Sequence, residues 1–224
     1  EQHLSSSKDK KPIFEDLLTK QTIPASAALA NIRKLASLGI SRTLIADYFV
    51  NLVDANATTL GFLAAAQAVP AWQNLLENVL LKTARSQNRL PGKTLVLVNR
   101  ASSMGFCLDC TPIEPHTDLT RADIALAITI DLQKICDEIE LWGFTADSNS
   151  WTQQVINKLR GKAVIDTWCK PIALTSGFSL RASLEPQPAT SNLNAALELI
   201  LKQDYQRLIV ITHQNPAPLE PMHG

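Results

Sequence analysis

The stretch TLVLVNRASSM, residues 94–104, combines a β-strand signal with a run of small and polar residues directly after it. Its first five residues are threonine, leucine and valine without interruption, a composition typical of a strand buried on both faces. In open α/β sheets, ligands bind beyond the carboxyl ends of such strands. The stretch therefore predicts a largely parallel sheet and a candidate site at residues 99–104.

The chain after this stretch alternates between helical and strand patterns. The apolar spacing predicts helices over 121–138, 151–160 and 192–202, and strands over 140–144 and 207–212. Residues 161–185 are harder to assign and leave room for an edge strand. The alternation predicts an α/β domain with a mostly parallel, doubly wound sheet, whose second ligand-facing end lies at 212–215.

The chain before residue 92 has the pattern of short helices joined by tight turns. One helix follows Pro24 and ends at Gly39, the next has Ser41 as its N-cap, a third runs through 60–66, and a fourth follows Pro70. Such helices are typical of stacked, HEAT-like repeats. We therefore predict a polar lead-in over 1–22 with a short amphipathic piece, an α-helical repeat segment over 23–91, and the α/β domain over 92–224.

Composition limits the classes of function. The chain is 46% hydrophobic and 19% charged with zero net charge, which indicates a soluble globular protein rather than a disordered tail or a polycation. No apolar run is long enough to span a membrane, and the polar N-terminus is no secretory signal. Four cysteines form no dense disulfide framework, so we expect the cytoplasm or another reducing compartment. Residues 1–93 carry eleven Lys/Arg against seven Asp/Glu, which weakly favours an acidic partner there.

Several ordered segments carry a resemblance to known families. LVLVNRASSM at 95–104 resembles the first strand and metal loop, Asp-x-Ser-x-Ser, of von Willebrand factor A domains. The stretch from TLGFLAAAQAV to NRASSM, residues 59–104, resembles the junction between helical repeats and A domain in TROVE proteins, the Ro autoantigen family. ASAALANIRKLASLGIS at 25–41, SNLNAAL at 191–197 and LIVITHQN at 208–215 extend the similarity over roughly residues 23–215.

The resemblance implies a function in RNA binding. In TROVE proteins a ring of helical repeats holds the ends of misfolded RNAs and binds small noncoding RNAs, and the A domain carries a divalent cation. By this resemblance, Arg33, Lys34 and Arg42 are candidates for contacts with RNA phosphates. From the residues alone, the favoured interpretation of the same three side chains is solvated cations on helix faces.

The metal site of the A domain is altered at four of the five positions that the resemblance aligns. Asn99 replaces the first Asp, Ala101 replaces the first Ser, Ser191 replaces the Thr and His213 replaces the final Asp, whereas Ser103 is kept. Because Mg²⁺ is usually held through one or two carboxylates, these changes predict a degenerate site with no metal and no other cofactor. We expect the remaining polar residues to form a neutral hydrogen-bonding rim.

Size and the end of the chain also depart from the family. About 70 residues of repeats are too few for a ring, because each repeat buries its core only against its neighbours. The A-like domain ends eleven residues after His213, in the Pro-rich tail NPAPLEPMHG, and is expected to be truncated at its C-terminal end. Either a fragment or a reduced paralogue within a larger assembly fits, and both predict other protein subunits as partners.

Two local patterns have competing interpretations. Cys107, Cys110 and His116 could form half of a zinc site or hold a dithiol, although a plain surface loop is favoured because a second Cys pair is missing. His213 could act as a base on Ser103 or Ser191, but catalysis also needs an orienting acid and an oxyanion hole, and neither is evident.

Cys136 and the four tryptophans, Trp72, Trp142, Trp151 and Trp168, are interpreted as core residues.

These observations predict a non-enzymatic component of an assembly that contains RNA, with no small-molecule substrate. The alternative is a pure protein–protein interaction scaffold in a multisubunit complex that makes no RNA contact.

Overall fold

The computed structural model describes residues 10–51, 57–82, 89–105, 119–146, 167–187, 192–200 and 204–213. The chain divides into two compact units, residues 1–85 and 86–224, and each is described by itself. The division falls six residues before the boundary of 91/92 expected from the sequence. β1 (Leu90–Asn99) begins two residues before the expected boundary, so residues 90 and 91 belong to the sheet.

All the regular secondary structure that is described in the first unit is helical. Its elements are α1 (Lys10–Thr19), α2 (Ala25–Ala30), α3 (Ile32–Ser37), α4 (Arg42–Asn51), α5 (Thr59–Ala68), the 3₁₀ turn η2 (Pro70–Trp72) and α6 (Gln73–Lys82). The amphipathic piece predicted within the lead-in is α1, which packs against α4 and buries Leu18 almost completely. Part of the expected lead-in therefore belongs to the helical unit.

The helix predicted between Pro24 and Gly39 is divided into α2 and α3 at Asn31. The side-chain amide Nδ2 of Asn31 donates to the carbonyl of Ala27 at 2.8 Å, and the residue has φ −96° and ψ 13°. Asparagine side chains compete in this way with the backbone for hydrogen bonds and so interrupt helices. The predicted C-terminal signal is confirmed, because Gly39 has a φ of +67°, which glycine adopts without strain.

Caps and aromatic packing hold the helical unit together. Ser41 Oγ accepts the backbone N–H of Leu44, so the predicted N-cap of α4 is confirmed. Phe49 makes edge-to-face contacts with Tyr48 and Phe62, with ring centroids 4.9 and 5.4 Å apart. The Tyr48 hydroxyl also donates to the carbonyl of Ile23, so this core ties α4 to the start of α2.

The second unit contains a mixed α/β fold around a four-stranded sheet. Its strands are β1, β2 (Cys136–Ala146), β3 (Thr167–Pro171) and β4 (Arg207–Ile211), in the order β3-β2-β1-β4. β1 pairs in parallel with both β2 and β4, whereas β3 is antiparallel to β2. The mostly parallel sheet and the edge strand within 161–185 are confirmed, and the 94–98 run lies in β1, which has a neighbour on each side. Leu95, Val96, Leu97 and Val98 are all buried, as expected for a strand covered on both faces.

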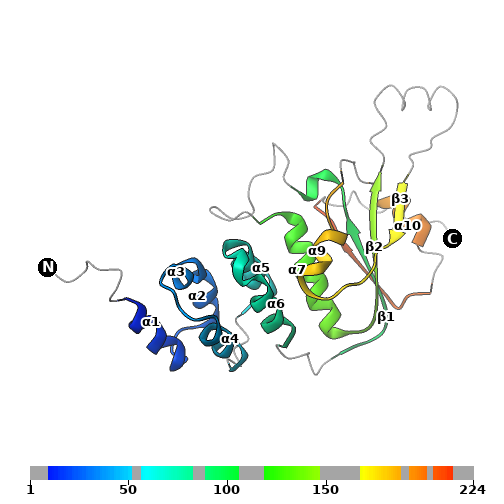
Figure 1. The fold of residues 1–224 in the computed structure, drawn as a ribbon. Helices are drawn as coiled ribbons and strands as arrows, with labels where there is room; N and C mark the ends of the chain where they lie inside the picture. The colour runs from blue at the N-terminus through cyan, green and yellow to red at the C-terminus, as the bar shows by residue number, and fades with distance from the viewer. Residues whose placement is uncertain are drawn as a thin grey trace. The chain divides into compact units, whose positions relative to one another are not determined.

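The helices of this unit are α7 (Arg121–Ile135), the single turn α9 (Leu180–Ser183) and α10 (Leu193–Ile200), with the 3₁₀ turns η3 (Ser102–Met104) and η4 (Gly177–Ser179). Figure 1 shows α7 and α9 on one side of the sheet and α10 on the other. α10 packs Ala196 and Ile200 onto Leu95, Leu97 and Phe144. The helix before β2 and the helix before β4 therefore cover opposite faces.

The helix expected over 121–138 is wrong in its last three residues. α7 ends at Ile135, and Cys136 turns to an extended conformation, φ −84° and ψ 141°, and begins β2. Sheet pairing decides this boundary, because Glu138, Ile139 and Glu140 lie opposite Lys93, Thr94 and Leu95 of β1. Cys136 is buried as predicted, although it lies in a strand and not on a helix face.

Three of the tryptophans fall within described residues. Trp72 is buried, Trp142 packs beside the cluster under α10, and Trp168 is partly exposed. Trp151 and the helix predicted over 151–160 lie outside the described residues. Among the helices that the structure describes, none combines the length and the apolar surface that a membrane crossing requires.

Candidate functional site

The candidate site lies where the carboxyl ends of β1 and β4 meet. These two strands are parallel neighbours, and the helices that precede β2 and β4 lie on opposite faces of the sheet. At such a place the connections diverge and leave a crevice at the strand ends, where ligands bind in many open α/β sheets. Asn99 ends β1, and Thr212 and His213 follow β4, so residues 113 and 114 positions apart meet there.

The orientation of the Asn99 amide is fixed by its neighbours. Asn99 is only 1% exposed, and its Oδ1 accepts the backbone N–H of Ala101 at 2.8 Å. Since a backbone N–H can only donate, the Nδ2 group must face the other way. It donates to Thr212 Oγ1 at 3.1 Å and lies 3.3 Å from Nδ1 of His213. Both ends of the buried amide therefore have partners.

His213 is neutral in this arrangement. Its Nδ1 lies 3.1 Å from Ser103 Oγ as well as next to the Asn99 amide, and the tautomer with the ring proton on Nε2 lets Nδ1 accept from both neighbours. Burial lowers the pKa of His213 below its ordinary value, and the positive charge of Arg121 lowers it further. Arg121 is held close by, since its Nη1 donates to the carbonyl of Ser103 at 3.0 Å.

The residues at this site do not fit a divalent cation. Among the described positions that the A-domain pattern aligns, none carries a carboxylate, and the Oδ1 of Asn99 is already engaged by a backbone N–H. Mg²⁺ prefers carboxylate oxygens in octahedral geometry, and a softer ion needs about four His or Cys ligands. Within the described ranges no three His, Cys, Asp or Glu side chains gather into such a group. The donor set forms a hydrogen-bonded rim instead.

The same geometry is poorly suited to nucleophilic catalysis. A base that activates Ser103 would need an acceptor on the opposite ring nitrogen to hold the imidazole in place. Within the described residues no carboxylate is hydrogen-bonded to His213. The Nδ2 group of Asn99 is a donor and lies next to Nδ1, the ring nitrogen that would have to accept the proton of Ser103. Ser103 and His213 are brought together as predicted, and in the part of the chain that the structure describes no carboxylate orients the ring.

Four of the predicted site residues cannot be placed. Ser191 of the aligned metal positions, and Cys107, Cys110 and His116 of the zinc alternative, lie outside the described residues.

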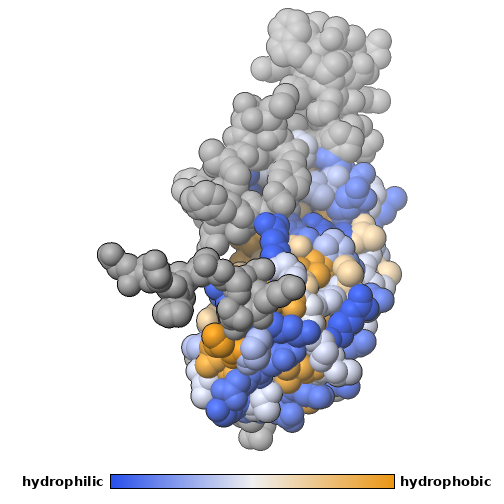
Figure 2. All heavy atoms as spheres, turned by 60° about the vertical axis from the view of Figure 1, so that its left-hand side comes forward, coloured by the Kyte–Doolittle hydropathy of each residue, from blue (hydrophilic) through white to orange (hydrophobic). Residues whose placement is uncertain are grey.

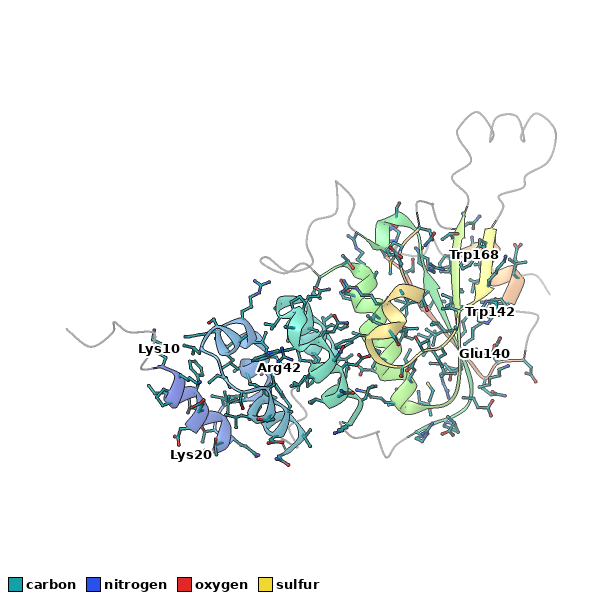
Figure 3. The ribbon with its side chains drawn as sticks, viewed as in Figure 1. Lys10, Lys20, Arg42, Glu140, Trp142 and Trp168 are labelled. Atoms are coloured by element: carbon teal, nitrogen blue, oxygen red, sulfur yellow. The ribbon has the colours of Figure 1, made fainter. Side chains whose placement is uncertain are left out.

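The three predicted phosphate contacts lie in the helical unit. Arg33 and Lys34 are on α3 and Arg42 begins α4, and all three are exposed. Figure 3 shows Arg42 together with Lys10 and Lys20, which lie near the two ends of α1. Lys34 Nζ is 5.1 Å from the centre of the Phe14 ring, a cation–π contact that leaves its charge intact. On the face seen in Figure 2, hydrophilic residues are interrupted by small hydrophobic patches.

Sequence reasoning missed several residues around the site. Arg100 follows Asn99 and points to the opposite face, where its guanidinium lies 5.3 Å from the Trp168 ring and donates to the carbonyl of Glu185. Strand alternation after Asn99 could have indicated this orientation. Asp123 was also missed, although Thr120-x-x-Asp123 ahead of an apolar run is a capping-box signature, and both of its hydrogen bonds are present.

No family model, no curated protein and no solved structure matched the chain when it was compared with each of the three. The resemblance to TROVE proteins and to von Willebrand factor A domains therefore stays a prediction from the residues quoted above.

Proposed function

We propose that this chain is a non-catalytic, RNA-binding component of a ribonucleoprotein assembly, in which a TROVE-like helical segment contacts RNA and a doubly wound, A-like domain provides a protein-binding platform. The observation that carries the proposal is the contrast between two groups of cations in the helical unit. Lys11 and Lys20 on or just after α1 are paired with carboxylates four residues away. Arg33 and Arg42 form no ion pair with any residue in the described ranges.

This difference matters because only unpaired cations gain fully from a phosphate. A cation that already has a carboxylate partner must give up that contact or bring the negative charge toward the RNA. Arg33 and Arg42 are exposed and carry planar guanidinium groups, which match phosphate oxygens in a bidentate manner. Lys34, next to Arg33, adds a third exposed charge on the same pair of helices.

The test is a titration of the full chain with a fluorescently labelled single-stranded RNA over a range of salt concentrations. The double variant Arg33→Glu and Arg42→Glu should weaken binding, and the slope of log K against log salt should become shallower by about 1.4, since each phosphate contact on single strands contributes about 0.7. The matched control is Lys11→Glu with Lys20→Glu, which changes the net charge by the same amount at paired positions. Equal losses in both double variants would argue against a defined contact at α3 and α4.

The A-like part of the proposal is tested by restoring the family's metal ligands. In a triple variant, Asn99→Asp, Ala101→Ser and His213→Asp place two carboxylates and one more hydroxyl at the meeting point of β1 and β4. If the unit has A-domain geometry, Mg²⁺ should raise the thermal midpoint of this variant and leave the unchanged chain unaffected. No effect of Mg²⁺ on the triple variant would count against the A-domain assignment.

A scaffold without RNA is the second candidate, and exposed apolar side chains favour it. In the helical unit Ile13, Val50 and Leu81 are 57%, 49% and 45% exposed, which is high for large apolar residues on three different helices. Scattered apolar residues are common on monomers, so this observation is weaker than the cation contrast. Native purification with mass spectrometry, before and after nuclease treatment, distinguishes the two functions. Protein partners that dissociate after nuclease treatment indicate a ribonucleoprotein. Protein partners that remain bound after nuclease treatment indicate the scaffold.

A further inference from the structure

A pocket of about 740 Å³ opens in the α/β unit beside the turn that follows β1. Its wall is built from η3, the first turn of α7, the η4–α9 turn and residues 184–187. In Figure 1, α9 lies beside α7, which brings these segments together although they are about 60 residues apart in the chain. The volume is in the range of about 300–1,000 Å³ that small-molecule sites occupy.

One wall of the pocket holds an ion pair between a buried carboxylate and a half-exposed guanidinium. Asp123 of α7 is 1% exposed, and its Oδ2 accepts from the backbone N–H and the hydroxyl of Thr120 at 2.9 and 2.8 Å. Its other oxygen, Oδ1, lies 2.9 Å from Nη2 of Arg181 on α9. The capping box uses only Oδ2, so the cap does not require Arg181. The pair instead fixes the position of the guanidinium at the pocket wall.

Arg181 keeps most of its hydrogen-bonding capacity. Its side chain is 53% exposed, and within the described residues it forms one ion pair, the contact to Asp123. A guanidinium has five N–H donors in a rigid plane, so several remain available for a second, planar acceptor. Holding the group in advance lowers the entropy cost of binding such an acceptor.

Among the described lining residues, Arg181 is the one that carries a positive charge. Two carboxylates also belong to this lining: Asp123 is buried and paired with Arg181, whereas Glu185 is exposed and attracts the nearby Arg100, whose pKa this attraction raises against the larger lowering effect of burial. Phe178 and Leu184 supply apolar surface in the wall, and Thr120 a hydroxyl. Such a site combines one fixed charge with an apolar wall, as small-molecule sites commonly do.

We propose that this pocket binds a small organic oxyanion, whose carboxylate or phosphate group pairs with Arg181 and whose apolar part lies against Phe178 and Leu184. The binding is reversible and involves no chemical step. It does not depend on RNA binding by α3 and α4, since every described lining residue belongs to the α/β unit.

The test is calorimetric titration of the full chain with three probes: glutarate, adenosine 5′-monophosphate and adenosine. At least one anion should bind saturably, and adenosine, which lacks the charge, should bind at least tenfold more weakly than its monophosphate. Binding of glutarate alone identifies a carboxylate site, and binding of the monophosphate alone identifies a phosphate site. Failure of both anions at millimolar concentration, or equal binding of adenosine and its monophosphate, overturns the proposal.

Variants at Ala182 test whether the anion binds in this pocket. Ala182 is exposed, lines the pocket and follows Arg181, so it can be changed without removing the partner of buried Asp123. Ala182→Glu should weaken anion binding by about tenfold and Ala182→Lys should strengthen it severalfold, as expected for one charge a few ångströms away. The matched control Ala30→Glu adds the same charge at an exposed alanine of the helical unit and should leave the affinity unchanged.

The variant Arg181→Lys separates the contribution of the planar guanidinium geometry to anion affinity from the contribution of the positive charge. It keeps a cation beside Asp123, so folding is preserved, but it removes the planar fork and should weaken the anion severalfold. Unchanged affinity in Ala182→Glu, Ala182→Lys and Arg181→Lys alike would show that the anion binds elsewhere and would overturn the proposal.

Discussion

Nδ2 of Asn99 lies 3.3 Å from Nδ1 of His213, so the ends of two neighbouring parallel strands meet through neutral nitrogen groups. The Asn99 amide is locked by the backbone N–H of Ala101, and this lock turns the amide N–H groups toward Nδ1 of His213, which favours Nδ1 as an acceptor. Protonation of Nδ1 would place an N–H against the amide N–H groups. The protonation state of one histidine is therefore coupled to the contact between β1 and β4.

The first prediction concerns pH. The pKa of His213 is lowered in the folded state, by burial and then by Arg121, so His213 stabilises the fold above its unfolded pKa of about 6.5. That contribution is lost as pH falls through the lower, folded pKa. The free energy of unfolding, measured by urea denaturation, should therefore fall between pH 7 and pH 5. In His213→Gln this part of the decline should be absent. An identical pH profile in the two proteins would contradict the role assigned to His213.

Asn99→Asp should reverse the direction of this pH dependence. A carboxylate at this buried position attracts a proton to Nδ1 and raises the pKa of His213 above its unfolded value. Stability from this pair is then present below pH 6.5 and is lost as pH rises through the raised pKa. At pH 8 the variant should be destabilised, on the order of 1–3 kcal/mol, because a buried charge faces a neutral ring. Measurements at pH 5.5 and 8, with the exposed Ser102→Asp as control, decide whether the slope reverses.

Gly143→Ala should destabilise the α/β unit. A Cβ on Gly143 would lie 2.6 Å from Arg100 Cδ and 2.6 Å from Ile172 Cδ1, closer than side-chain carbons approach. Overpacking of this kind costs about 1–3 kcal/mol in the free energy of unfolding, which urea denaturation measures. Lys170→Ala, at the exposed position opposite Gly143 in β3, is the matched control and should change stability by less than about 0.5 kcal/mol. Similar losses in both variants would show that the close approach is not limiting.

The Cys169 thiol should be unreactive in the folded protein. Burial raises its pKa to about 11, so at pH 8 the thiolate fraction is roughly a hundredfold lower than for an ordinary thiol. Iodoacetamide labelling followed by peptide mass spectrometry should show Cys169 modified slowly in the native chain and rapidly in denaturant. Equal rates in the two states would mean that β3 leaves the thiol open to solvent.

The sequence by itself determined the elements whose signals are local. The β-branched and leucine run at 94–98 is typical of a strand covered on both faces. Ser41 and Gly39 mark helix ends, because side-chain capping and a positive φ depend on immediate neighbours. The same reasoning indicated that Asn99, Ser103 and His213 belong to strand ends on one edge of the sheet. At the positions that the A-domain resemblance aligns, their residue types argued against a magnesium site.

Tertiary structure decided everything that depends on distant partners. α7 stops at Ile135 because Glu138 and Ile139 pair with β1, and no local propensity marks that boundary. The orientation of the Asn99 amide and the proton position on His213 follow from Ala101, Thr212 and Ser103, which only folding brings together. The pairing of Asp123 with Arg181 joins two helices 58 positions apart. Hydrogen bonds and ion pairs act over a few ångströms, so residues distant in sequence meet only where the packed sheet and its helices place them.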